Sequence, residues 1–187
     1  RPFKEHPFQV KDDKEMFLLQ ESIEKYGILN PLIVRPVPDG YYEIISGHRR
    51  KHAAEKLGYR KVPVIIRVLS EDDSILSMVD SNLHRERISY SEKAFAYKLK
   101  NDVLKRKSSR KKSQVDHKTP RKRAIEIISE DCGDSPKQVQ RYISLTKLIP
   151  EMLQKLDDEI ISFCPAVEIA ALSEKEQREL LVAMEYA

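Results

Sequence analysis

Residues 132–145, with the sequence CGDSPKQVQRYISL, decide how the second half of this 187-residue chain folds. Gly133 stands where a tight turn between two helices needs a positive φ, which glycine adopts without steric cost. Ser135 and Pro136 then supply an N-cap and a first helical residue, and Gln138 completes a capping box. The pattern therefore predicts two helices joined by a tight turn, a helix-turn-helix over residues 123–147.

The two predicted helices would pack through apolar residues and leave a polar face outward. The apolar stripes comprise Ile125, Ile128, Cys132, Val139, Tyr142 and Ile143. Gln can bond bidentately to adenine and Arg to guanine in the major groove, while Lys and Ser suit phosphates. The candidate DNA contacts are therefore Ser135, Lys137, Gln138, Gln140, Arg141, Ser144 and Lys147. An αα-hairpin with a solvated polar face is the alternative that this pattern leaves open.

A concentrated basic segment precedes this pair of helices. Between Lys100 and Arg123, eleven Lys and Arg residues stand against two Asp residues, whereas the whole chain has a net charge of only +4. Such a segment favours a polyanionic partner, because phosphate neutralisation supplies most of the non-specific affinity for DNA. Arg121, Lys122 and Arg123 therefore join the candidate DNA contacts. The alternative is a solvated, flexible linker, and residues 108–118 are expected to be disordered without DNA.

The first half of the chain alternates helix and strand signals. Asp12 and Asp13 can cap a helix that Gly27 ends, and Asp39-Gly40 predicts a hairpin turn. Strands are expected at residues 28–35, 41–46 and 62–69, the last of them buried because it is rich in β-branched residues. A helix through Leu57 and another from the Ser70 capping box to Glu86 complete a predicted α+β domain over residues 1–88.

Beyond residue 88 the sequence carries almost no strand signal. Ser89 with Glu92 forms a capping box, and Phe95, Leu99 and Val103 follow at helical spacing. Further helices are predicted at 120–131, 136–147, 151–161 and 174–186, the first of them capped by Thr119 and Pro120. We therefore expect an all-α domain over residues 89–187, with helices at 151–187 that buttress the helix-turn-helix.

The segment SGHRR, residues 46–50, joins a predicted strand to a predicted helix. Backbone N–H groups at the helix start, the positive end of the helix dipole and two guanidinium groups would together suit a phosphate chain. Gly47 would let the backbone approach the anion closely. A surface turn whose arginines pair with nearby acids is the alternative.

Four blocks of sequence resemble the ParB family of chromosome and plasmid partition proteins. They are GILNPLIVR at 27–35, YEIISGHRR at 42–50, VPVI at 62–65 and NLHRE at 82–86, in the order and spacing of that family. The resemblance covers roughly residues 6–150. It implies a small mixed-sheet ParB/sulfiredoxin-like N-terminal domain that binds CTP with Mg²⁺, followed by a domain that binds a centromere-like DNA site. In that family, CTP converts a dimer into a clamp that slides along DNA.

The resemblance also implies roles for particular residues. The family's Gly-Glu-Arg-Arg box, which holds the triphosphate, falls on Gly47, His48, Arg49 and Arg50. The family's Glu-Asn-x-x-Arg-Glu box begins at Ser81, so Asn82 is the implied metal ligand and Arg85 an implied phosphate or structural contact. Ser81 replaces the Glu linked with metal binding and CTP turnover, which leaves hydrolysis open.

The family resemblance further implies a homodimer, a partition ATPase as a partner, and a cytoplasmic location on nucleoid or plasmid DNA. The role would be partition, nucleoid occlusion or mobile-element maintenance. No run of 18 apolar residues predicts a membrane span. Two other functions remain open: a nucleotide-independent transcription regulator and, less favoured, a metal-dependent nuclease that would use Asp72, Asp73 and Asp80.

Overall fold

A computed structural model describes residues 1–3, 8, 10, 12–83, 85, 88–112 and 123–185. The chain divides into two units, Arg1–Asn82 and Leu83–Ala187, and each is described here by itself. The first unit mixes strands and helices, and the second is helical throughout the described residues, so the predicted α+β class is confirmed. None of the described helices is both long and apolar enough to cross a bilayer.

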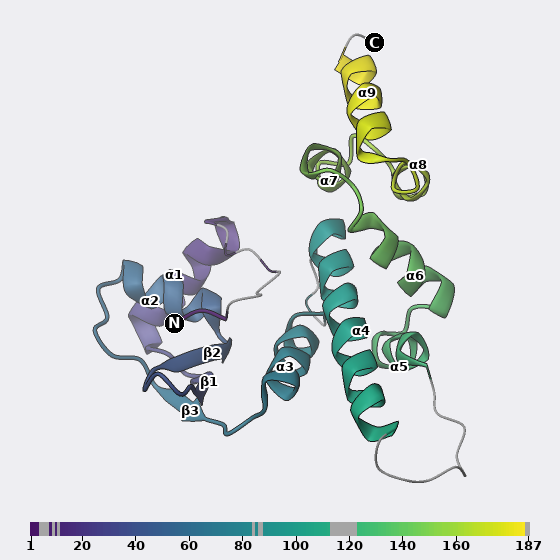
Figure 1. Cartoon of the computed structure of the whole chain (residues 1–187). Coiled ribbons are helices and arrows are strands. Elements are labelled where there is room, and N and C mark those ends of the chain that lie inside the picture. Colours follow the sequence, from purple (N-terminus) through teal and green to yellow (C-terminus); the bar gives the residue numbers. More distant parts are fainter. Residues whose placement is uncertain are drawn as a thin grey trace. The chain divides into compact units, whose positions relative to one another are not determined.

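The first unit is built on a three-stranded sheet of order β2-β1-β3 (Figure 1). The central strand β1 (Leu32–Pro36) pairs antiparallel with β2 (Tyr42–Ser46) and parallel with β3 (Val64–Ile66). Gly40, in the predicted hairpin turn, has a φ of +79°. The sheet is therefore small and mixed, as the sequence predicted.

Helices α1 (Lys14–Tyr26) and α2 (His48–Lys56) pack against each other and lie together over the sheet (Figure 1). Asp13 caps α1, because its carboxylate accepts a hydrogen bond of 2.8 Å from the backbone N–H of Met16. Met16, Ile23 and Ala53 form the buried cluster between the two helices. The third helix of the unit, α3, spans Glu71–Leu83.

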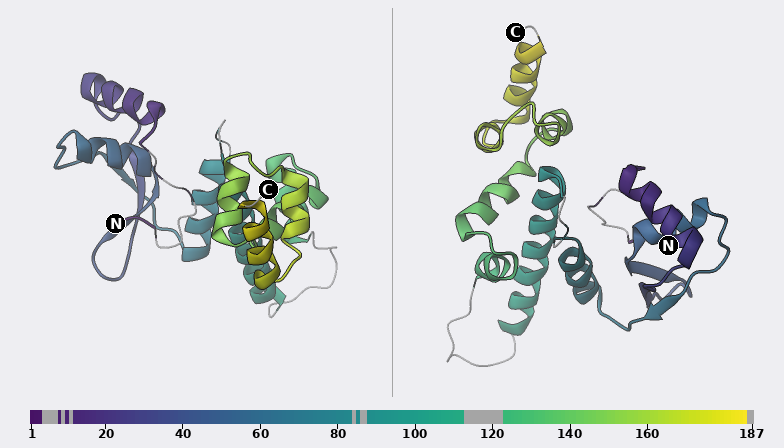
Figure 2. Two further views of the ribbon diagram at one scale, coloured as in Figure 1. Left: turned by 90° about the horizontal axis from the view of Figure 1, so that it is seen from above. Right: turned by 180° about the vertical axis from the view of Figure 1, so that it is seen from behind.

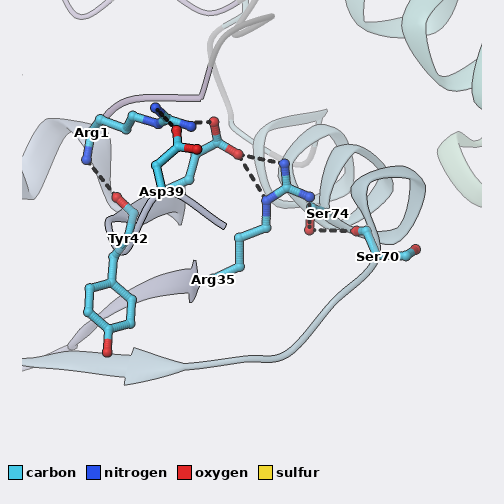
Figure 3. Close-up of polar contacts among 7 residues, drawn as sticks. Arg1, Arg35, Asp39, Tyr42, Ser70 and Ser74 are labelled. Atoms are coloured by element: carbon cyan, nitrogen blue, oxygen red, sulfur yellow. Dashed lines mark hydrogen bonds and ion pairs between the residues drawn. The ribbon is translucent and has the colours of Figure 1, made fainter. Parts of the chain in front are cut away.

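A buried ion pair joins β1 to β2. The guanidinium of Arg35 donates to Glu43 through Nη2 at 2.6 Å and through Nε at 2.9 Å, and the Glu43 side chain is only 3% exposed. Nη1 of Arg35 also donates to Ser74 Oγ at 3.3 Å (Figure 3). A buried carboxylate needs such a partner. This pair therefore fixes the start of α3 relative to the strands. Ser70 caps α3, as predicted, since its Oγ accepts from the Asp73 N–H at 3.1 Å.

The prediction of a buried strand at residues 62–69 is wrong. Strand β3 has three residues, and Val64, Ile65 and Ile66 are 45%, 44% and 51% exposed. Val68, beyond its end, is 88% exposed. A run of β-branched residues indicates a strand but does not say where in a sheet that strand lies. Here it lies at the edge, with a neighbour on one side only.

The second unit consists, among its described residues, of six helices whose apolar faces meet in one core. Helices α5 and α6 lie beside α4, on the same side of it (Figure 1 and Figure 2). Tyr142 lies at the centre of an aromatic group, with its ring 5.7 Å from that of Tyr97 and 4.8 Å from that of Phe163. The helices are α4 (Tyr90–Lys112), α5 (Ala124–Cys132), α6 (Pro136–Leu145), α7 (Pro150–Asp157), α8 (Phe163–Ile169) and α9 (Glu174–Glu185).

The long helix α4 differs from its prediction in which residues it buries and in how far it extends. Val103 is buried, but Phe95 is 38% exposed, and Ala94 and Tyr97 face the core instead. The helix continues through residues 108–112, which were expected to be disordered, while 113–118 lie outside the described residues. The Ser89 cap is confirmed, because its Oγ accepts from the Glu92 N–H at 3.2 Å.

The remaining helices shift from their expected bounds. Helix α5 begins after Arg123, whose backbone N–H donates to the Glu126 carboxylate at 2.8 Å. The cap predicted at Thr119 and Pro120 lies outside the described residues. Helix α7 ends at Asp157, four residues before its predicted end, and α8 was not predicted at all.

Two aspartates, one at the end of α5 and one in the turn before α6, bond side chains of α4. Asp134 Oδ2 accepts hydrogen bonds from the Tyr97 hydroxyl at 2.6 Å and from Lys93 Nζ at 2.8 Å. Lys100, which is 2% exposed, reaches Asp131 at 2.7 Å. Burial raises the pKa of Tyr97, so its hydroxyl keeps the proton that it donates. These bonds fix the position of α6 along the axis of α4.

Replacing Asp134 with Asn should destabilise the second unit. Burial raises the pKa of Asp134, but Lys93 and the Tyr97 hydroxyl outweigh it and hold that pKa below its ordinary value of 3.8. We expect Asp134→Asn to lower the free energy of unfolding by about 1–3 kcal/mol at neutral pH, because a charged hydrogen bond is lost. Urea unfolding followed by circular dichroism measures this.

The bonds from Lys93 and Tyr97 to Asp134 should also make the free energy of unfolding depend on pH. A depressed carboxyl pKa stabilises the fold above the unfolded pKa, and the contribution disappears as pH falls through the folded value. The difference between wild type and Asp134→Asn should therefore shrink in acid. Asp158→Asn, which removes an exposed charge bonded to Gln154 at 2.9 Å, serves as the control. Equal losses in both variants would contradict the role of Asp134.

Candidate nucleic-acid interface and phosphate loop

The turn before α6 has the geometry that its sequence predicted. Gly133 has a φ of +73° and donates its N–H to Ser129 O at 3.0 Å, which ends α5. Ser135 Oγ then accepts from the Gln138 N–H at 3.2 Å, and Pro136 is the first residue of α6. The Ser129 hydroxyl closes the turn by donating to Asp134 O at 2.6 Å. Short-range bonds thus define both ends of the turn.

Helix α6 has one apolar and one polar face. Val139, Tyr142 and Leu145 are buried in the core, and Ile143 packs against it half-buried. The predicted DNA contacts between residues 137 and 147 lie outside that core: Lys137, Gln140 and Lys147 are exposed, and Gln138, Arg141 and Ser144 are half-buried. The polar face is therefore available to a ligand from solvent.

Some predicted contacts also have structural bonds. Ser135 caps α6, and Ser144 Oγ donates to Arg141 O at 2.7 Å, so both hydroxyls have partners within the helix. Arg123 is exposed at the start of α5. Arg121 and Lys122 lie outside the described residues. The side chains left for base contact on α6 are thus chiefly the Gln and Arg residues.

One lysine of the basic segment does not face solvent. Lys100 is 2% exposed and bonds Asp131, so it cannot neutralise a phosphate. Lys105 and Arg106 on α4 are exposed. The charge count of the sequence therefore overstates the positive charge available to DNA, because it includes a core residue.

Gly47 caps the N-terminus of α2 in a conformation that only glycine adopts easily. Its φ is +105°, and a Cβ there would lie 2.9 Å from Leu32 Cγ and 3.2 Å from a guanidinium nitrogen of Arg50. A side chain at this position would be strained and would clash. The close approach of backbone, β1 and Arg50 thus requires glycine.

The arginines that follow Gly47 already have protein partners. Arg49 bonds Asp13 through Nη2 at 2.8 Å and Nη1 at 3.2 Å, and its Nη2 lies 3.7 Å from Glu15. Arg50 donates to Asn30 O and, at 2.8 Å, to Pro31 O. The Arg49 bond, followed by the Met16 amide, holds the pKa of Asp13 below its ordinary range. In this structure Arg49 therefore pairs with acidic residues, as expected if the loop is a surface turn and not a phosphate site.

The implied metal ligand is a buried amide. Asn82 is 3% exposed and donates through Nδ2 to Met78 O at 2.7 Å, while its Oδ1 has no hydrogen-bond partner among the described residues. Ser81 Oγ donates to Met78 O at 2.9 Å. No group of three or more His, Cys, Asp or Glu side chains suited to a metal is found in the described part of the chain. Asn82 Oδ1 fits Mg²⁺ as one of the six oxygens of its octahedral shell. Arg85 is exposed and belongs to the second unit.

Sequence reasoning missed the residues that hold the helix-turn-helix in place. Lys93, Tyr97 and Lys100 lie at steps of four and three along α4, so they share one helix face. That spacing could have indicated from the sequence that these side chains face the same neighbouring element. Their partners are Asp131, in the last turn of α5, and Asp134, in the loop after it, and nothing local in the sequence pairs the two sets.

Comparison with known proteins identifies both the first unit and the wider fold. The family model described as ParB N-terminal domain matches residues 1–83. The nucleoid occlusion protein of Bacillus thuringiensis (strain Al Hakam) is 40% identical over 96 residues. That segment is 51% of this chain and 33% of the relative, so the match spans about a third of the relative's length. The same protein from Bacillus mycoides (strain KBAB4) is equally similar.

Two solved structures share the fold across most of the chain. A C-terminally truncated chromosome-partitioning protein ParB from Caulobacter crescentus, complexed to the centromeric parS site, has a TM-score of 0.56 and 25% identity. The likeness covers 96% of this chain and 93% of that one. A Pnob8-like ParB-N domain has a TM-score of 0.60 at 17% identity, covering 91% of this chain and 75% of that one, and shares the fold alone. These matches confirm the resemblance seen in the sequence: residues 1–83 match the ParB N-terminal domain, and most of the chain shares the fold of a ParB protein.

Proposed function

We propose that this chain is a sequence-specific DNA-binding protein of the partition or nucleoid-occlusion type. It binds a centromere-like duplex site through α6, and CTP gates that binding. The polar face of α6 carries the proposal, because it stays accessible while the opposite face is buried. The named activity of the Bacillus relatives and the parS complex of the Caulobacter protein support it.

Helix α6 suits the role of a recognition helix. Recognition helices contact base edges chiefly through their N-terminal residues. Gln138, Gln140 and Arg141 offer bidentate groups for adenine and guanine, and Lys137 and Lys147 offer charges to phosphates on either side. Arg123 and the outward cations of α4, such as Lys105, would add phosphate contacts. Two copies of the chain would match a palindromic site.

The nucleotide part of the proposal rests on the N-terminus of α2. CTP supplies a triphosphate anion, which Arg49 and the backbone around Gly47 and His48 would bind at the positive end of the helix. For this, Arg49 exchanges Asp13 for phosphate, and that exchange is cheap because the pair is partly exposed. Asn82 Oδ1 would supply one ligand to Mg²⁺, which screens the phosphate charge.

A nucleotide-independent regulator is the second candidate function. The observation that favours it is the engagement of Arg49 and Arg50 by groups of the protein itself. Ser81 in place of a Glu also removes a carboxylate from the box that the family uses for turnover. Both candidates share α6 as the DNA-binding element, so they differ only in whether CTP binds.

Arg141→Ala tests the DNA interface. We expect specific affinity to fall by about 5–150-fold, because a bidentate Arg–guanine contact contributes about 1–3 kcal/mol to discrimination. Sites selected from a random duplex pool supply the specific ligand, and fluorescence anisotropy measures binding to it and to random DNA. Lys175→Ala, on α9 and 86% exposed, is the matched control. Equal losses on specific and random DNA would make Arg141 a phosphate contact instead.

Asp13→Asn and Arg49→Ala test the nucleotide site in opposite directions. Asn still caps α1 but carries no charge, so Arg49 becomes available and CTP should bind several-fold more tightly. Arg49→Ala removes a charged hydrogen-bond donor and should weaken binding by about 10–100-fold. Calorimetry with CTP and Mg²⁺ measures both, with Glu21→Gln on the same helix as control. No heat from any variant at millimolar CTP would leave the nucleotide-independent function.

A further inference from the structure

The outer edge of β3 has open backbone hydrogen-bonding groups. Leu32 N–H donates to Pro63 O at 3.0 Å, and Arg67 N–H donates to Val34 O at 2.8 Å, so residues 63 and 67 face β1. Backbone groups alternate in direction along a strand. Val64 and Ile66 therefore point their N–H and C=O groups away from the sheet, toward solvent.

One edge of the sheet is covered by backbone, and the other is open. At the β2 edge, the Ile44 N–H donates to Arg1 O at 3.0 Å, so another stretch of backbone covers that strand. At the β3 edge, Val64, Ile65 and Ile66 are 44–51% exposed. Proteins usually protect a free edge with charge inside the strand or with a covering segment. Four apolar side chains in five residues, Val68 included, are instead exposed here.

Cations flank this apolar run at both ends. Arg60 and Lys61 precede it and Arg67 follows it; all three are exposed, and none makes an ion pair with a described residue. Other cations of the same unit do have partners, as Arg35 pairs with Glu43 and Arg49 with Asp13. Lys14 and Lys25 of α1 also lack an ion pair with any described residue, but Arg60, Lys61 and Arg67 are the unpaired cations that lie at the two ends of the open edge. They favour a ligand with carboxylates near its ends.

A second copy of the chain is a poor ligand for this edge. If two β3 strands paired antiparallel about Ile65, Arg67 of each would lie opposite Pro63 of the other and diagonal to its Lys61. If they paired parallel, each Arg67 would lie beside its counterpart. Like charges in such cross-strand positions are destabilising. The charges therefore favour a different protein.

We propose that the outer edge of β3 binds an extended segment of a partner protein by strand addition. The segment alternates apolar residues along its length and carries Asp or Glu at both ends. Its backbone pairs with Val64 and Ile66, and its carboxylates approach Arg60, Lys61 and Arg67. This inference goes beyond the proposed function, since neither DNA nor CTP takes part in it.

A synthetic strand tests the proposal on the full chain. The probe is a fluorescent peptide, Glu-Glu-Val-Thr-Val-Thr-Val-Glu-Glu with blocked ends, and its control has Lys in place of every Glu. We expect saturable binding of the acidic peptide in anisotropy, at least tenfold tighter than that of the basic one. Amide NMR shifts should centre on residues 60–68. Equal binding of the two peptides, or none, overturns the proposal.

Variants separate the backbone contribution from the charges. Ile66→Pro removes an outward N–H and none of the N–H groups that bond β1, so the ladder to β1 stays intact while peptide affinity falls at least fivefold. Arg60→Glu with Lys61→Glu lies outside the strand, and it tests the charges even if the proline variant fails to fold. Lys175→Glu is the control. A variant-sensitive self-association without peptide binding would show a second copy as the occupant and overturn the proposal.

Discussion

The orientation of the proposed recognition helix depends on the Asp134 carboxylate. The inner face of α6 is apolar, and apolar contacts are not directional. Hydrogen bonds from Tyr97 and Lys93 to Asp134 are directional, and they act at the turn that starts the helix. The Lys93 ammonium also lies 4.6 Å from the centre of the Tyr142 ring, so the same cation contacts both the turn and the inner face of α6. The buried apolar face of α6 stabilises the fold, and the hydrogen bonds of Asp134 fix the orientation of the helix.

The sequence predicted the parts of the fold that short-range physics decides. The caps at Asp13, Ser70, Ser89 and Ser135 each depend on a bond to an N–H three residues away, so their spacing is visible in the sequence. The burial of β3 was predicted wrongly because it depends on which strands lie beside it, and β-branched residues favour edge and centre alike.

The candidate site was predictable only where it lies on one helix. The outward side chains of α6 follow from the spacing of its apolar residues, because both faces belong to a single period. The partner of Lys100 is 31 residues away, and that of Arg49 is 36 residues away. No local pattern joins such pairs. The sequence therefore counted Lys100 among cations for a polyanion, although the fold uses it in the core.

Arg49 and Arg50 differ in whether a phosphate can take the place of their protein partners. Arg50 donates to the carbonyl oxygens of Asn30 and Pro31, and a phosphate cannot replace it there, because those oxygens need a donor. Arg49 bonds Asp13, whose other bond, from the Met16 N–H, caps α1 whether or not Arg49 stays. An arriving phosphate can therefore take Arg49 without leaving a buried group unpaired. The pairing seen in this structure thus leaves Arg49 as the arginine that can exchange its partner. Arg50 bonds both carbonyl oxygens through Nη1 alone, so it stays a predicted phosphate contact.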